Sequence, residues 1–125
     1  MGMDVYGQAP RSEAGKYFRR NMWHWPPLAS WITTMWPELT APCQYWFSND
    51  HDGLNDEQSV ALADAIDAHV ASGEFERLHA MVSEAVEGYG GEYAPWKGSG
   101  RFPLTAEDLR EFSAFLRDCG GFKIS

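Results

Sequence analysis

The chain has 125 residues, the length of one domain, and carries 18 Asp and Glu residues against 10 Lys and Arg residues. Its formal net charge of −8 disfavours nucleic acid and anionic membranes as direct partners and favours basic proteins or cations. Aromatic residues make up 14% of the chain, too many for a disordered acidic tail, and no apolar run approaches the ~20 residues of a membrane span.

The charge is divided unevenly along the chain. Residues 1–36 hold four bases and two acids, residues 37–92 hold twelve acids and one base, and residues 93–125 hold five bases and four acids. We therefore divide the single expected domain, 1–125, into an aromatic N-terminal part, an acidic helical part and a C-terminal part with these bounds. No secretion signal opens the sequence, so we expect a cytoplasmic protein whose two cysteines are reduced.

In the N-terminal part, the alternation from Met3 to Tyr6 predicts a short strand that ends at Gly7, and residues 8–16 predict a loop. The pair Pro26-Pro27 predicts a break, because proline lacks a donor and restrains the residue before it. This prolyl pair is expected to open a helix over residues 28–36, where apolar residues recur with the spacing of one helical face, and Pro37 ends it.

Between these elements, residues 16–25 interleave bases with aromatic rings, and this stretch has two interpretations. Either its rings belong to the core and are covered by the arginines, or Arg19, Arg20, Trp23 and Trp25 form a contact surface for a protein partner. Direct nucleic-acid binding through the N-terminal bases is not expected, because the acidic part lies on the same small domain.

The acidic part contains a polar loop from Asn49 to Gly53. A calcium loop over residues 48–59 would need a bidentate glutamate at its last position, where Ser59 stands, so we interpret the segment as a turn before a helix. An alternative function, a metal- or small-molecule-dependent enzyme or binding protein, would use this loop, with Asp50 and Asp52 as metal ligands. Apart from that alternative, we predict no catalytic residue and no cofactor.

Two helices follow this loop. Asn55 has the position of an N-cap, with Gln58 three residues later, and the first helix ends near Gly73. The second helix carries an apolar stripe over residues 75–89 and ends in the glycine-rich segment 88–91. Acidic residues on the two helices would imitate a row of phosphates: Asp64, Asp67, Glu84 and Glu87.

The C-terminal part begins with an irregular connector, residues 90–104. Thr105 and Asp108 form a capping box at the start of the last helix, and Gly120-Gly121 end that helix in left-handed backbone. Four apolar residues of this helix are expected to be buried against the two preceding helices: Leu109, Phe112, Phe115 and Leu116. The predicted fold is mostly α with a minor β component (α+β), with about four helices and a short strand pair between Val5 and residues 122–124.

Four segments of the chain carry a resemblance: residues 1–7 (MGMDVYG), residues 17–28 with their YFR, Asn21, Trp23 and Trp25, residues 49–54 (NDHDGL), and residues 111–122 with EF, FLRD and GGF. Over most of the chain these motifs resemble a group of short bacterial and phage-encoded proteins that has no assigned activity. Members of that group often carry two CxxC pairs before the last helix. Residues 91–102 hold no cysteine, so no zinc ribbon is expected here.

The resemblance implies a phage or prophage context and no mechanism. Together with the charge pattern, it favours a non-enzymatic acidic binding or inhibitory protein that acts on a basic, nucleic-acid-handling protein. The acidic helices would face that partner, and the N-terminal aromatic residues would anchor the contact. We expect no membrane binding, and the sequence leaves the oligomeric state open.

Overall fold

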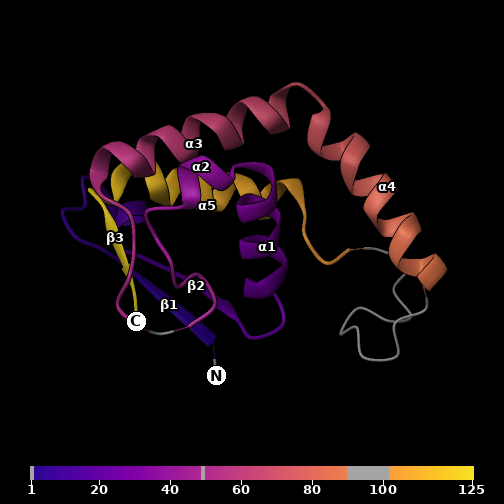
Figure 1. Cartoon of the computed structure of the whole chain (residues 1–125). Helices are drawn as coiled ribbons and strands as arrows, with labels where there is room; N and C mark the ends of the chain where they lie inside the picture. The colour runs from indigo at the N-terminus through magenta and orange to yellow at the C-terminus, as the bar shows by residue number, and fades with distance from the viewer. Residues whose placement is uncertain (1, 49, 90–101) are drawn as a thin grey trace.

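The computed structural model describes residues 2–48, 50–89 and 102–125, in which three strands from the two ends of the chain form one antiparallel sheet (Figure 1). β1 (Gly2–Gly7) lies between β2 (Tyr17–Asn21) and β3 (Phe122–Ile124). A single 3₁₀ turn, η1 (Glu13–Gly15), lies in the loop that joins β1 to β2. The predicted pairing of the two ends is confirmed, and β2 is a third strand that the sequence analysis did not predict.

The two faces of the sheet differ, because successive side chains of a strand point to opposite sides. Val5 opposes Phe18 on β2 and Ile124 on β3, and all three side chains are buried. On the other face, Tyr6 and Tyr17 are nearly half exposed, and their ring centroids lie 5.2 Å apart. The core of the protein therefore lies on one side of the sheet.

Helix α1 (Trp25–Met35) starts earlier than predicted. The prolyl pair opens this helix as predicted, but the two prolines stand inside its first turn, where backbone N–H groups have no intrahelical acceptor. The predicted end of the helix at Pro37 is confirmed. That proline opens the short helix α2 (Pro37–Thr40).

Two of the long helices start at the predicted capping boxes. In α3 (Asp56–Ala71), the Asn55 side chain accepts from the backbone N–H of Gln58 at 2.8 Å, and the Gln58 side chain accepts from the backbone N–H of Asn55 at 2.9 Å. In α5 (Ala106–Asp118), Thr105 and Asp108 exchange the same pair of bonds. Among the described residues, no helix combines the length and the apolarity that a membrane crossing requires.

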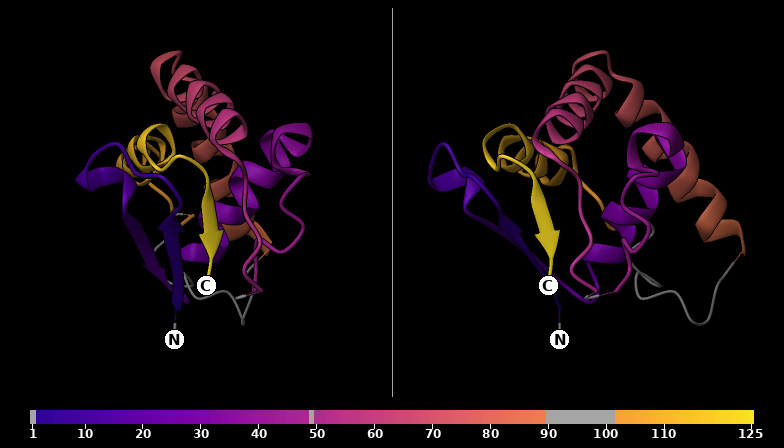
Figure 2. Two further views of the ribbon diagram at one scale, coloured as in Figure 1. Left: turned by 90° about the vertical axis from the view of Figure 1, so that its left-hand side faces the viewer. Right: turned by 60° about the vertical axis from the view of Figure 1, so that its left-hand side comes forward.

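Helices α3 and α5 lie side by side above the sheet (Figures 1 and 2). The predicted apolar face of α5 is buried: Leu109, Phe112, Phe115 and Leu116. The expectation that α5 packs against both central helices is half right, because α4 (Glu74–Tyr89) turns away from α5 after Gly73 and descends past α1. At that turn Gly73 has a φ of +81°, a left-handed conformation that favours glycine.

Candidate functional site

The two predicted contact arginines are held within the molecule. Arg19 donates to a carboxylate oxygen of Asp4 at 2.7 Å, and the Tyr17 hydroxyl donates to the same oxygen. These bonds, that of Tyr17 first and that of Arg19 second, lower the pKa of Asp4. Arg20 lies 4.4 Å from the centroid of the Phe18 ring and pairs with two acids of α5, so it fastens the sheet to that helix.

The two described members of the predicted acidic row also make internal contacts. Arg117 of α5 pairs with Asp64 at 2.8 Å and with Asp67 at 2.6 Å. Asp67 further accepts from the hydroxyl of Ser113 at 2.7 Å, so this carboxylate clamps α3 to α5. The hydrogen bonds that Arg117 donates, to Asp67 first and to Asp64 second, raise its pKa. The side chains of the other two members, Glu84 and Glu87, lie outside the described part of the structure.

The polar loop before α3 is built around Asp52. This carboxylate accepts from the backbone N–H groups of Gln44, Gly53 and Tyr45 at 2.6, 2.9 and 3.3 Å. Partial burial raises the pKa of Asp52, but the three backbone donors outweigh burial, so the pKa lies below its usual value. Asp50 is exposed and accepts from the Ser48 hydroxyl at 2.6 Å. Among the described residues, no group of three or more His, Cys, Asp or Glu side chains is placed to hold a metal.

The backbone of the same loop pairs with β3. The His51 N–H donates to the Ile124 carbonyl at 2.9 Å, and the Ile124 N–H donates to the Asp52 carbonyl at 2.8 Å. A Cβ atom at Gly53 would stand 1.7 Å from the Phe122 carbonyl oxygen, so this close approach requires glycine. The loop therefore extends the sheet beyond β3 through backbone hydrogen bonds. This structural role is not evident from the composition of the loop.

The two cysteines are buried and free. Burial raises the pKa of Cys43 to about 12, and burial also raises the pKa of Cys119. A thiolate is the reactive form of cysteine, so neither residue is activated as a nucleophile at neutral pH. Both thiols are part of the core.

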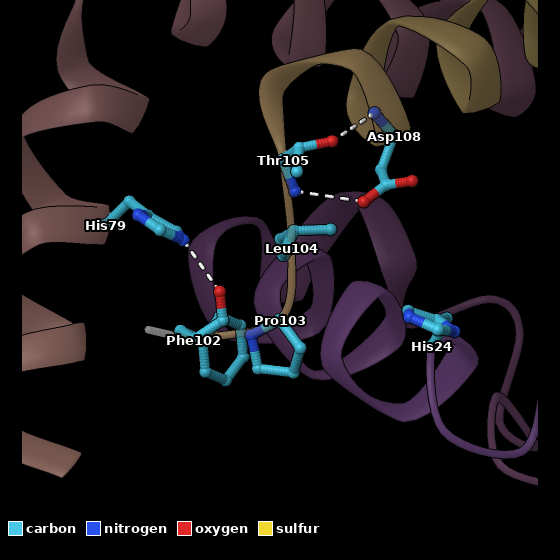
Figure 3. Close-up of a pocket in the computed structure, with 7 residues that line it drawn as sticks. All are labelled: His24, His79, Phe102, Pro103, Leu104, Thr105 and Asp108. Carbon is cyan, nitrogen blue, oxygen red and sulfur yellow. Dashed lines mark hydrogen bonds between the residues drawn. The ribbon is translucent and has the colours of Figure 1, made fainter. Parts of the chain in front are cut away.

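A hollow of about 490 Å³ lies where the segment before α5 passes between His79 of α4 and His24 at the start of α1 (Figure 3). Its polar groups mostly bind the chain itself. His79 donates from Nε2 to the Phe102 carbonyl at 2.8 Å, and Thr105 and Asp108 close the capping box on each other. This arrangement positions Phe102 and the start of α5 rather than presenting a nucleophile and a base to a substrate.

The turn before α1 separates the two predicted contact tryptophans. The side-chain oxygen of Asn21 accepts from the backbone N–H groups of Trp23 and His24 at 2.9 and 3.0 Å. Trp25 enters the core, where its indole N–H donates to the Trp46 carbonyl at 2.6 Å. Trp23 is 55% exposed. The structure therefore places one of the two rings in the core and the other on the surface.

Around Trp23, apolar side chains form an exposed cluster. Met22 is 52% exposed and Phe47 is 59% exposed, and with Trp23 they border a hollow of about 300 Å³. Its remaining lining comes from the first turns of α1 and from the segment before α5: Pro26, Pro27, Ser30 and Phe102. A cluster of large apolar side chains at a concave surface is typical of a binding site.

A second hollow, of about 240 Å³, continues this surface between α1 and α4. It shares Ser30 and Phe102 with the first hollow, and the rest of its lining is Trp31, Thr34, Met35, Leu78 and Val82. We call the two hollows together the α1–α4 groove. Two hydrogen bonds join the backbone of Phe102 to side chains of α4. Its N–H donates to the Ser83 hydroxyl at 2.9 Å, and its carbonyl accepts from His79.

Acidic residues stand close in the sequence to several residues of the groove lining. Several bases are paired with acids of the same molecule: Arg11, Lys16, Arg19, Arg20, Arg77 and Arg117. Two exposed acids follow residues of the groove lining by three positions in the sequence. Glu38 follows Met35, and Asp50 follows Phe47. Glu74 precedes Leu78 by one helical turn.

Sequence reasoning singled out Trp23 but missed Phe47, Leu78 and Phe102, because the groove is assembled from four separate segments of the chain. The apolar stripe of α4 was the one available signal, since its residues Leu78 and Val82 are only partly buried against the core. No family model, curated protein or solved structure matches the chain. The groove is therefore interpreted from its own geometry and chemistry.

Proposed function

We propose that this protein is a non-enzymatic binding protein of phage or prophage origin, and that its partner is a protein with a basic surface. The observation that carries the proposal is the exposed cluster of Met22, Trp23 and Phe47 at the mouth of the α1–α4 groove. Tryptophan and other aromatic residues dominate the binding energy of protein interfaces when they fill or line such pockets. Isolated exposed rings are common, but three large apolar side chains around one hollow favour a contact surface.

The charge of the molecule supports a basic partner. Many of the described basic side chains form ion pairs within the molecule, and the whole chain has a formal net charge of −8. Proteins that handle nucleic acid present basic surfaces, so they belong to the class of partner that this charge attracts. Occupation of such a surface would compete with nucleic acid, which gives the proposed protein an inhibitory action.

The proposal is tested by affinity capture from a bacterial lysate with three immobilised proteins. These are the wild type, the double variant Trp23→Ala and Phe47→Ala, and the control Tyr6→Ala, which truncates an aromatic ring that is 46% exposed on the sheet. We expect the wild type and the control to retain the same basic protein and to release it in high salt, and the double variant to lose it. Retention of the same proteins by all three would refute the proposal.

A further inference from the structure

We infer that the hydrogen bond between Trp31 of α1 and His69 of α3 is a pH-sensitive switch. Protonation of His69 breaks this bond and releases α4 from the body of the fold, while α3 and α5 stay packed together. The switch depends on contacts within the chain and is independent of the partner proposed above, so it adds a response to acid to the proposed function.

The bond requires the neutral form of His69. The indole N–H of Trp31 donates to Nε2 of His69 at 3.2 Å, and both side chains are buried. Because an indole nitrogen only donates, Nε2 is the unprotonated nitrogen and the neutral ring carries its proton on Nδ1. A second proton would occupy Nε2 and would set two N–H donors against each other. Protonation therefore replaces an attractive contact with a repulsive one.

Aromatic rings surround His69 in the packed state. Its ring centroid lies 5.1 Å from that of Trp36 and 6.0 Å from those of Trp31 and Phe75. A charge among these rings loses its hydration, and this burial lowers the pKa of His69. Breaking the bond lets water reach the imidazole, so protonation and release favour each other.

The charged groups beside His69 favour its cation. Glu74, in the first turn of α4, raises the pKa of His69 against the larger effect of burial. Glu74 also pairs with Arg77 at 2.6 Å. His69 lies in the last turn of α3, and the C-terminal end of a helix attracts positive charge. Once the imidazole is hydrated, its charged form is therefore accessible near the usual pKa of histidine.

Other titratable groups on the neighbouring elements leave this bond unchanged. The residues of α1 do not titrate, Glu38 of α2 is exposed, and Arg117 of α5 forms ion pairs with two acids of α3. His79 of α4 donates from Nε2 to the Phe102 carbonyl at 2.8 Å, and an imidazolium donates such a bond equally well. The bond to Trp31 therefore depends on the titration of one imidazole.

Trp31 joins α4 to the rest of the fold. Its ring centroid lies 5.0 Å from that of Phe75 in the first turn of α4 and 5.8 Å from that of Phe102, whose backbone is hydrogen-bonded to two side chains of α4. Before α4, Gly73 has left-handed backbone, and a Cβ atom there would find no heavy atom within 4 Å. The chain can therefore bend at Gly73, and α4 can move together with Phe102 once Trp31 shifts.

The direction of the pH dependence follows from the lowered pKa. In the packed state the pKa of His69 lies below its usual value of 6.5, and in the released state it returns toward that value. The packed state is therefore fully favoured above about pH 6.5. Each pH unit below this value favours release by up to about tenfold, until the packed-state pKa is reached.

The inference is tested by NMR spectroscopy of the full chain between about pH 7.5 and 5. Three quantities are followed: the imidazole signals of His69, the indole N–H signal of Trp31, and amide hydrogen exchange, expressed as protection factors. The variants are His69→Gln, whose side-chain oxygen can still accept from Trp31, and the control His79→Gln, which removes a second histidine whose ring lies 6.4 Å from Trp31. Thermal melts at about pH 7.5 check that both variants fold.

In the wild type and in His79→Gln, we expect the indole signal of Trp31 to shift with the same midpoint as the imidazole of His69, below about pH 6.5. Protection of α4 should fall by up to about tenfold per pH unit, while α3 and α5 stay protected. In His69→Gln, neither the indole signal nor the protection of α4 should change.

No shift of the Trp31 signal in the wild type, different midpoints for Trp31 and His69, or equal loss of protection in α4 and α5 would each overturn the inference. The same step in His69→Gln, or its absence from a folded His79→Gln, would also overturn it. The first three outcomes need only the wild type, so they decide the inference even if a variant does not fold.

Discussion

Replacing Phe112 with alanine removes the ring at the centre of the core. This side chain is 0% exposed, and its neighbours come from several elements of the fold. The centroid of its ring lies 5.0 Å from Phe18 of β2, 6.0 Å from Trp25 of α1 and 6.5 Å from Phe122 of β3. The substitution would therefore leave a cavity between β2, α1 and β3, and these separate elements cannot easily close it.

The expected cost follows from this environment. Removal of a buried phenylalanine ring typically costs about 3–5 kcal/mol, and the cost is greatest where the site collapses least. Each aromatic contact adds about 0.5–1.5 kcal/mol beyond the area buried, so the upper half of the range applies to Phe112. A domain of this size is stabilised by about 5–15 kcal/mol, and the variant should lie close to unfolding.

Urea denaturation, followed by tryptophan fluorescence, measures the effect. With a dependence of about 1.5 kcal/mol per M of urea, the midpoint should fall by about 3 M. Arg110→Ala is the control, because Arg110 is exposed on the same helix, and its midpoint should stay within about 0.5 M of the wild type. Equal midpoints for the two variants would refute the packing described for α5.

Four further outcomes are expected. His69 of α3 is buried, and its Nε2 accepts from the indole N–H of Trp31 at 3.2 Å. Because burial lowers the pKa of His69, the stability that depends on its neutral form is complete above about pH 6.5 and is lost as the pH falls through the folded-state pKa. Thermal melts between about pH 7.5 and 5 should show this loss in the wild type and not in His69→Gln. Cys43 should react with a thiol reagent only after denaturation, since its pKa is about 12, and rapid labelling of the folded protein would contradict its burial. Gly53→Ala should lower the melting temperature, because its Cβ would stand 1.7 Å from a carbonyl oxygen of β3, and an unchanged value would show that the loop can move away. Asp67→Asn should destabilise more than Asp64→Asn, by about 1 kcal/mol or less because both carboxylates are partly exposed, and equal melts would mean that the Ser113 bond contributes nothing.

Local signals in the sequence predicted the starts of two helices correctly. The capping boxes at Asn55 and Thr105 depend on residues three positions apart, and the left-handed glycines after α5 act on their own backbone. Pro26 and Pro27 correctly indicated that a helix opens here, but its start was predicted after them because proline is typical both of a break and of a first helical turn.

The candidate site was beyond the reach of local signals. Trp23 and Trp25 are only two positions apart in the sequence. The turn that Asn21 stabilises nevertheless places Trp23 on the surface and Trp25 in the core. Arg19 and Asp67 looked available for a partner, but their ion pairs join residues 15 and 50 positions apart in the chain. Such pairings follow from the tertiary arrangement, which charge patterns along the sequence do not encode.

The central position of β1 affects how the chain folds during synthesis. Its pairing with β2 joins residues close in the sequence, whereas its pairing with β3 joins Val5 to Ile124 and so has a very high contact order. On the ribosome, one edge of β1 must stay unpaired while all the helices are made, and an open strand edge promotes association with other chains. Completion of the sheet therefore depends on β3, which is synthesised after the helices, and deletion of β3 should leave a form with an open strand edge that requires chaperones.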